Sequence, residues 1–373
     1  MKQERKNRIH IEFGSDIDSL ANDKFIKKRV NNEWLDNSYF FRSGRDCLKY
    51  IAKIQRNNSS RIFIPYPCCD SMVMPFKLYN YEIIYYPLNS DYTISFEYLK
   101  NKVNSNDILL VENYLGLKND KQLNQEEEEL SELKKTKKIV IIQDYTQSLE
   151  QSLYTKKDVY DYYVFSCRKW ASLPDGGVLW CKKEILIIYD QYSSRYYDMR
   201  KTALDLKSDY LKNKDDNLKK VFLKKLKEAE AFLENDKSII EISEYSKNLI
   251  RYIDFESILS IRKRNVAYFE KCFSEKVATN GSFKLLSLNS NCSGQYFPIY
   301  VDQQQELQKY LVKEKIYCPI LWPSPFEKDT KNFIFGNDLI CHMLAIPCDQ
   351  RYNLIEIKHI VKKIIEFYSK KNK

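Results

Sequence analysis

The stretch VIIQDYTQ (residues 140–147) starts as an apolar, β-rich run and ends in polar side chains, and SCRK (residues 166–169) follows a second run of the same kind. A short apolar run bounded by polar residues is typical of a buried strand. Asp144 therefore stands where one predicted strand ends, and Lys169 stands just after another. In open α/β sheets, ligands collect at the carboxyl ends of strands, so both residues are placed at a candidate ligand site.

Similar apolar runs recur through the first two hundred residues and alternate with helical patterns. One helix is predicted over residues 44–55, where the apolar side chains share a face: Cys47, Leu48, Ile51 and Ala52. Strands that alternate with helices predict an α/β fold with a doubly wound, mainly parallel sheet. The predicted strands are residues 61–66, 82–87, 107–112, 138–143, 160–166 and 177–181.

The pattern changes in the second half of the chain. Residues 182–273 are polar and helical in period, and no proline interrupts them. The apolar positions that carry this period are Leu218, Val221, Phe222, Leu226 and Ala229.

After this helical part, strands are expected again, and they predict a smaller α+β domain. The later elements are strands at 283–286 and 295–301 and helices at 303–313 and 353–369. We expect a large domain over residues 1–250, which includes a helical segment from about 183 to 250, and a small C-terminal domain over residues 251–373.

Composition and charge exclude several classes of protein. The 373 residues carry a net charge of +10, but the lysines are interleaved with acids, which is typical of solvated helix faces rather than of a nucleic-acid site. No apolar run approaches the roughly 20 residues that span a bilayer, and the charged N-terminus carries no secretion signal. We therefore expect a cytoplasmic protein with neither a nucleic-acid nor a membrane partner.

Cysteine and histidine usage predicts no metal site. The 10 cysteines include no C-x-x-C pair, and the histidines are only His10, His342 and His359. A structural zinc site needs ligands at short, fixed spacings. In a protein without a secretion signal, the cysteines are expected to be reduced thiols.

Ser43, Gly44 and Arg45 open the predicted helix 44–55. A helix N-terminus offers unpaired N–H groups and the positive end of the helix dipole, and so favours phosphate. Gly44 would let the backbone approach an anion closely. The alternative is that Ser43 only caps the helix. The glycines of the DGG segment at 175–177 allow a tight turn into the next strand.

Lys169, Ser166 and Asp144 form a set with a definite chemistry. A lysine can hold an aldehyde as a Schiff base and then move protons as a general base. The serine could bind a phosphate, and a carboxylate can keep a pyridinium nitrogen protonated. The set predicts pyridoxal 5'-phosphate as the cofactor, with Gln147 donating to its ring hydroxyl. The alternatives are that Asp144 caps the next helix and that Arg168 forms a surface salt bridge.

With these segments in this order, the chain resembles the DegT/DnrJ/StrS sugar aminotransferases, within fold type I of the pyridoxal-phosphate enzymes. The resemblance covers most of the chain and runs through these stretches: Ser43-Gly44, Ile64-Pro65-Tyr66, VENYLG (111–116), DYTQSL (144–149), SCRK (166–169) and IPCDQRY (346–352). It implies that Asp144 and Gln147 match the family's aspartate and glutamine, Lys169 its imine lysine and Ser166 its phosphate serine. It also implies a homodimer whose active sites lie at the subunit boundary.

The chain departs from the family pattern at several positions. Lys169 comes three residues after Ser166, where many members place it five after. The family often has an aromatic residue that stacks on the cofactor ring. In the matching stretch of this chain, Tyr66 or Cys69 would have to take that position. RYYDMR (195–200) matches the partner-reaching asparagine-tyrosine-arginine motif poorly, so no cross-subunit residue is assigned. The sugar-side histidine near 323–325 is missing.

The resemblance and the residues together predict an aminotransferase of nucleotide-sugar metabolism, as in polysaccharide biosynthesis. An amino acid such as glutamate would give its amino group through a Schiff base at Lys169, and a nucleotide-linked keto-sugar would take it. Another reaction of the same cofactor on a sugar, such as dehydration, is one alternative, although the known dehydrating branch carries histidine in place of the lysine. A non-catalytic scaffold or regulator with the same fold is the other.

Overall fold

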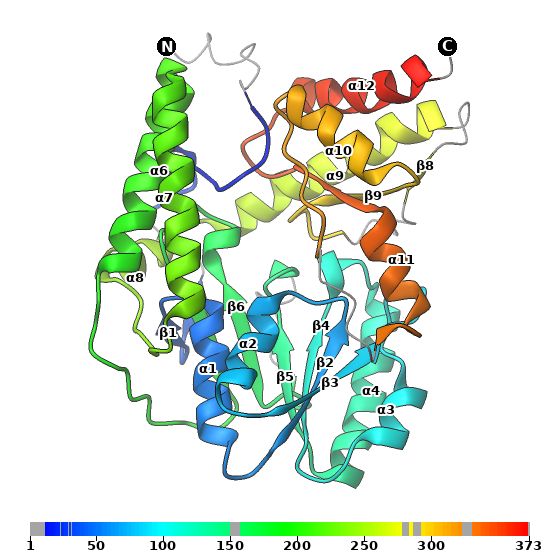
Figure 1. The fold of residues 1–373 in the computed structure, drawn as a ribbon. Helices are drawn as coiled ribbons and strands as arrows, with labels where there is room; N and C mark the ends of the chain where they lie inside the picture. The colour runs from blue at the N-terminus through cyan, green and yellow to red at the C-terminus, as the bar shows by residue number, and fades with distance from the viewer. Residues whose placement is uncertain are drawn as a thin grey trace.

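A seven-stranded sheet forms the centre of the large part of the molecule (Figure 1). The computed structural model describes residues 12–371 except 23, 29, 31, 150–156, 278–282, 286–291 and 323–329. The sheet has the strand order β1-β7-β6-β5-β4-β2-β3. Its strands are β1 (Tyr39–Phe41), β2 (Arg61–Tyr66), β3 (Glu82–Pro87), β4 (Ile108–Glu112), β5 (Val140–Asp144), β6 (Tyr162–Ser166) and β7 (Gly177–Cys181).

The sheet is mainly parallel, as predicted. Strands β2 to β6 run parallel, whereas β7 pairs antiparallel with β6, and β1 pairs antiparallel with β7. The six strands expected from the sequence are all present, with ends shifted by at most two residues. Strand β1 was not predicted, because three residues are too few to show a period of two.

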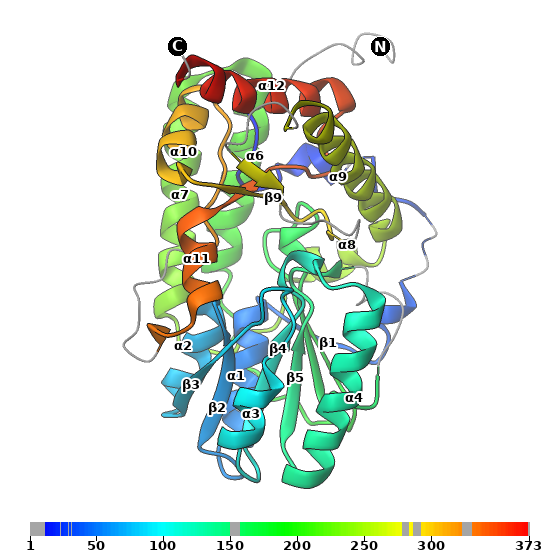
Figure 2. The ribbon, with the colours of Figure 1, turned by 90° about the vertical axis from the view of Figure 1, so that its right-hand side faces the viewer.

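Helices cover both faces of this sheet, which confirms the doubly wound arrangement (Figures 1 and 2). Alternate residues of β4 show it: Ile108 and Leu110 belong to one apolar cluster, and Leu109 and Val111 to another. The first cluster includes residues of α1 (Gly44–Gln55) and α2 (Asp70–Leu78), and the second includes residues of α3 (Phe96–Lys102) and α4 (Asp120–Lys137). A strand that is buried on both faces reads as a continuous apolar run, which is why these strands were visible in the sequence.

A pair of long helices follows β7 and stands beside the sheet (Figure 1). These are α6 (Arg195–Asn213) and α7 (Asp216–Asn235), which pack on each other through apolar clusters that include Tyr210 and Phe222. Helix α8 (Glu244–Ile250) comes next. The prediction of helix from residue 182 was wrong for residues 182–194, which form no helix.

The C-terminal part has its own core and a small antiparallel sheet of order β10-β9-β8. Its elements are α9 (Phe255–Val277), β8 (Phe283–Leu285), β9 (Phe297–Val301), α10 (Gln304–Lys313), α11 (Ile334–His342), β10 (Met343–Ile346) and α12 (Leu354–Lys371). Helix α11 and strand β10 were not predicted. The proposed domain boundary after residue 250 stays a prediction, and it falls between the end of α8 and the start of α9.

Short 3-10 helices complete the described elements, and two of them lie in the loops after β4 and β6. They are η2 (Ser19–Asn22), η3 (Glu33–Leu35), η4 (Tyr114–Gly116) and η5 (Cys167–Lys169). The last two follow β4 and β6 directly, so the residues after both strands turn within one step of the sheet edge. Among the helices of the described residues, none combines the length and apolar character needed to cross a bilayer.

Candidate active site

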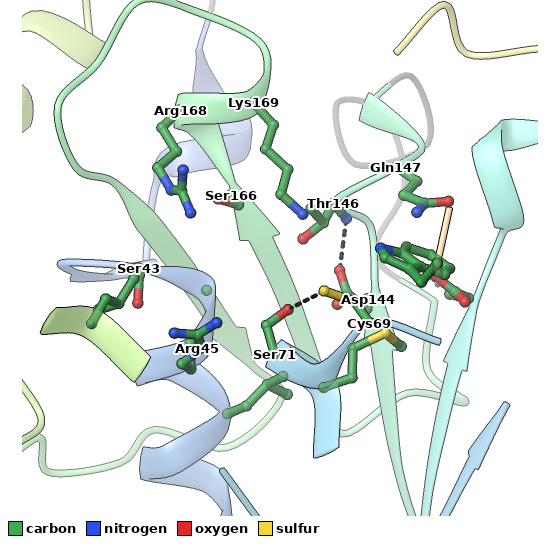
Figure 3. A pocket seen from close by; sticks show the side chains of 16 residues that line it. Ser43, Arg45, Cys69, Ser71, Asp144, Thr146, Gln147, Ser166, Arg168 and Lys169 are labelled. Carbon is green, nitrogen blue, oxygen red and sulfur yellow. Dashed lines mark hydrogen bonds between the residues drawn. The ribbon is translucent and has the colours of Figure 1, made fainter. Parts of the chain in front are cut away.

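A cavity lies at the carboxyl ends of β4, β5 and β6, beside the start of α1 (Figure 3). All the residues predicted for the site line it: Ser43, Gly44, Arg45, Asp144, Gln147, Ser166 and Lys169. The remaining lining residues are Leu48, Cys69, Ser71, Met72, Glu112, Thr146, Arg168, Leu233 and Trp322. Segments more than 100 residues apart in the chain therefore meet in one place.

The start of α1 is held by a hydrogen-bonded cap. Ser43 Oγ accepts a hydrogen bond from the backbone N–H of Asp46 at 3.1 Å, so the capping interpretation of Ser43 is confirmed. The buried guanidinium of Arg42 donates to both carboxylate oxygens of Asp46, at 2.8 and 3.0 Å, and to Asp236 at 2.5 Å. These contacts hold the start of α1 in place beside the cavity, which Gly44 and Arg45 line.

Two glycines allow backbones to meet at this helix start. A Cβ at Gly177 would lie 2.2 Å from the backbone carbonyl atoms of Ser43, so only glycine fits there. A Cβ at Gly44 would lie 3.6 Å from Cβ of Ser166, which is an ordinary contact. The close approach of β7 to α1 thus depends on Gly177, whereas the space at Gly44 would accept a Cβ.

Cationic side chains gather at the same end of the cavity. Arg45 lines it, and its Nε and Nη1 are buried without a hydrogen-bond partner within the described part of the chain. Arg168 forms the expected ion pair, with Glu230 at 3.1 Å, but its side chain is only 16 % exposed. The pair is therefore not a surface one, and Arg168 also lines the cavity. Unpaired guanidinium nitrogens beside a helix N-terminus are suited to an oxyanion.

Asp144 lies at the opposite, acidic end and is 7 % exposed. Its Oδ1 accepts a hydrogen bond from the backbone N–H of Thr146 at 2.7 Å, which forms a tight turn after β5 (Figure 3). Burial raises the pKa of Asp144, while the Thr146 hydrogen bonds and the charge of Lys169 oppose that rise. Gln147 follows, and its Oε1 accepts from the Leu115 N–H at 2.7 Å, which leaves its amide nitrogen as the free donor.

Lys169 lies between these two ends. Its side chain extends toward Thr146 and Asp144 in Figure 3. Its backbone is fixed from behind, because Arg262 donates to the carbonyl oxygens of Lys169 and Trp170 at 3.5 and 3.3 Å. The amine and the Asp144 carboxylate therefore share one cavity, which the sequence-based hypothesis required.

Two residues had been considered as the group that stacks on a planar ligand. Tyr66 is 2 % exposed, and its hydroxyl donates to Asn337 Oδ1 at 3.0 Å, away from the cavity lining. Cys69 does line the cavity, and its Sγ accepts a hydrogen bond from Ser71 at 3.1 Å. Of the two candidates, only Cys69 is placed to contact a ligand here.

Sequence reasoning missed Glu112, Trp322 and Leu233 as lining residues. Glu112 ends a buried apolar run in the same way as Asp144, so that signal was available. Trp322 precedes the proline-rich 323–325 segment, and only folding brings it beside β4 and β5. Leu233 belongs to α7, whose packing no local pattern foretold. The region of the missing sugar-side histidine lies outside the described residues.

A second cavity shares Gln147, Arg168, Lys169 and Trp322 with the first. Its other lining residues come from the N-terminal segment and the C-terminal part: Gly14, Ser15, Asp16, Ile17, Arg262, Gln295, Tyr296, Leu321 and Asp349. Lys169 therefore faces space on two sides. Within the described residues, no group of three or more His, Cys, Asp or Glu side chains could hold a metal ion.

No protein-family model matches the chain, and no curated protein sequence matches it. Solved structures do match. Spr1654 of Streptococcus pneumoniae, described as a sugar aminotransferase and solved in a PLP form, has a TM-score of 0.65 at 13% identity, over 97% of this chain and 99% of that one. PseC of Helicobacter pylori, an aminotransferase involved in the biosynthesis of pseudoaminic acid, has a TM-score of 0.58 at 14% identity, over 96% and 100%. A DegT DnrJ EryC1 StrS aminotransferase from Brucella abortus has a TM-score of 0.57 at 14% identity, over 94% and 93%. The resemblance found in the sequence is thus confirmed in three dimensions: this chain has the fold of the DegT/DnrJ/EryC1/StrS sugar aminotransferases.

Proposed function

We propose that the protein is a pyridoxal-phosphate-dependent aminotransferase that acts on a keto-sugar. The observation that carries the proposal is the arrangement of one cavity, with an anion-binding end at Arg45 and Ser166, a buried carboxylate at Asp144 and the Lys169 amine between them. The orphaned Nε and Nη1 of Arg45 fit a phosphate, which would supply the missing acceptors. The sugar aminotransferases with this fold support the same assignment.

The anion-binding end would hold the phosphate of the cofactor. Gly44 and Arg45 line the cavity at the start of α1, where unpaired N–H groups and the helix dipole favour negative charge. Ser166 adds a hydroxyl donor, and the Arg45 and Arg168 guanidinium groups supply charge. Because these groups are rigid, binding there would fix the orientation of everything attached to the phosphate.

The acidic end would act on the ring. When bound, pyridoxal phosphate supplies an electron sink, and a protonated ring nitrogen strengthens it. Asp144, facing that nitrogen, would hold the proton there by an ion pair in a cavity from which water is largely excluded. Gln147 has its amide nitrogen free to donate to the ring hydroxyl, because Oε1 is occupied by Leu115.

Lys169 has two tasks in this proposal. Its Nζ is the covalent attachment point for the cofactor aldehyde. Nζ would also be placed to take a proton from the substrate and to return it, as a general base and then a general acid. The second cavity, which Lys169 also lines, leaves room for the substrate on that side.

The finer statements are proposals that follow from the same resemblance. The amino donor is an amino acid such as glutamate, and the acceptor is a nucleotide-linked keto-sugar. The reaction belongs to nucleotide-sugar metabolism, as in polysaccharide biosynthesis, in the cytoplasm. The active enzyme is a homodimer, and the large domain ends near residue 250.

Covalent trapping tests the proposal. The purified protein is incubated with pyridoxal phosphate, reduced with borohydride and digested, and the modified peptide is identified by mass spectrometry. We expect the label on Lys169, with none at that peptide in Lys169→Ala and full labelling in Lys183→Ala, which removes an exposed lysine. Labelling spread over surface lysines in the wild type would contradict the proposed cofactor site.

Addition of glutamate separates transamination from the alternatives. An aminotransferase converts the absorbance of the lysine-bound cofactor to that of pyridoxamine phosphate with release of 2-oxoglutarate. A protein that binds the cofactor at Lys169 but shows no such change with any common amino acid would be a non-catalytic or dehydrating member of the fold.

A further inference from the structure

Glu112 is a second buried carboxyl at the ring end of the cavity. It is the last residue of β4, and its register partner on the neighbouring parallel strand is Asp144, the last residue of β5. Residues in register on adjacent strands project to the same face, so both carboxyls point to the same side of the sheet. Glu112 is 5 % exposed and lines the cavity together with Asp144 and Lys169.

Among the residues that the structure describes, none forms a salt bridge with the Glu112 carboxyl. Lys118 donates to the backbone oxygen of Glu112 at 2.9 Å but pairs its charge with Glu126, whose Oε2 it meets at 2.6 Å. Lys169 lines the same cavity, but its charge faces both Glu112 and Asp144. The nearby phenols are used elsewhere, since Tyr86 donates to Leu110 O and Tyr114 donates to Leu321 O, both at 2.9 Å. Glu112 Oε1 is buried without a hydrogen-bond partner among the residues that the structure describes.

The surroundings of Asp144 differ in kind. Its carboxylate accepts the Thr146 N–H at 2.7 Å, and a hydrogen bond to the charged form favours ionisation. Within the described part of the chain Glu112 Oε1 has no such donor, so of the two carboxyls Glu112 keeps a proton more readily. Two adjacent buried carboxylates that share the charge of one lysine, Lys169, would still repel each other in a cavity of low dielectric.

The electrostatics agree with this geometry. Burial raises the pKa of Glu112 to about 8, the charge of Asp144 adds to the rise, and the charges of Lys118 and Lys169 oppose it. The titratable groups that face Glu112 are thus Asp144 on β5, Lys118 after η4, Lys169 on η5, and the phenols of Tyr86 and Tyr114. At neutral pH, Glu112 is a neutral acid.

We propose that Glu112 is a positioning residue that carries the proton of the buried pair formed by Glu112 and Asp144. Asp144 is thereby the only negative charge of this pair. This single charge matches one pyridinium nitrogen, and only this match rests on the proposed function. The proton on Glu112 is a property of the cofactor-free protein.

Infrared spectroscopy of the cofactor-free protein tests the inference directly. At pH 7, we expect a carbonyl stretching band of a protonated, buried carboxyl in the wild type, its loss in Glu112→Gln and its retention in Asp144→Asn. The matched control is Glu128→Gln on α4, which removes an exposed carboxyl and should leave the band unchanged. A band that survives in Glu112→Gln, or that disappears only in Asp144→Asn, would overturn the proposal.

The pH dependence of melting supplies a second readout. The pKa of Glu112 rises from its ordinary 4.5 to about 8 on folding, so the folded state holds a proton that the unfolded state releases. Stability is therefore lost as the pH rises from about 4.5 to about 8. We expect a smaller fall in melting temperature over pH 5–8 in Glu112→Gln than in the wild type and in Glu128→Gln. Equal falls would count against the proposal.

These readouts distinguish the two claims. If borohydride fails to label Lys169 in the wild type, the proposed function fails while the infrared result still decides the state of Glu112. If labelling succeeds and the infrared band is independent of Glu112, only the present inference fails.

Discussion

The two ends of the central cavity are built by different means. The end near α1 presents backbone N–H groups, the hydroxyl of Ser166 and the guanidinium groups of Arg45 and Arg168. The other end presents the carboxyls of Asp144 and Glu112 at the edge of the sheet. One end is ready to bind an anion and the other to stabilise a cation, and Lys169 lies between them.

A different physical effect determines the properties of each end of the cavity. At the α1 end, geometry is fixed by local backbone features, namely the Ser43 cap and the close approach allowed by Gly177. At the sheet end, the charge state of the two carboxyls is set by burial, which raises the pKa of both, against the opposing charge of Lys169. Changes at the first end should therefore affect binding, and changes at the second should affect reactivity.

The substitution Asp144→Asn should break the acidic end and leave the other intact. Removing one member of a buried charge pair costs about 2–5 kcal/mol, which corresponds to a fall in kcat/KM of about 30-fold to 5,000-fold. The fall should lie mainly in kcat, because the phosphate contacts remain. Steady-state kinetics at saturating cofactor measure it, and a change confined to cofactor affinity would contradict the assignment of Asp144 to the ring.

The substitution Arg45→Ala should weaken the anion-binding end. A hydrogen bond to a charged group contributes about 1.5–3 kcal/mol, so the dissociation constant of the cofactor should rise by about 10-fold to 150-fold. Titration followed by absorbance measures it, with the exposed Lys53→Ala on the same helix as the control. An equal loss in both variants would show a general charge effect and remove Arg45 from the site.

The substitution Ser43→Ala tests the helix cap at the α1 end and has the smallest expected effect of the three substitutions. Loss of the cap should lower the free energy of unfolding by about 1 kcal/mol, as measured by urea denaturation of the cofactor-free protein. Ser43→Thr keeps a capping hydroxyl and should restore most of it. If the alanine variant instead keeps its stability and loses cofactor affinity, Ser43 is a phosphate ligand more than a cap.

Much of the fold could be predicted because its strands are buried on both faces. Strand β5 shows this, since a strand without a solvent face reads as an unbroken apolar run. Strand β1 and strand β10 were missed because three or four residues carry too little periodicity. Residues 182–194 were predicted as helix and form none, although they contain the apolar run at residues 185–189, and α6 begins only at Arg195.

The sequence by itself determined the residues of the candidate site that follow strands or open a helix, such as Asp144, Lys169 and Gly44. These residues were recognisable from their position after an apolar run or at the start of a helix, and all of them line the cavity. Only the tertiary structure decided that Cys69 rather than Tyr66 lines it, that Trp322 joins it from the C-terminal part, and that Glu112 forms no salt bridge with any residue that the structure describes. The physical reason is that burial and charge pairing depend on neighbours distant in the chain, which no local period records.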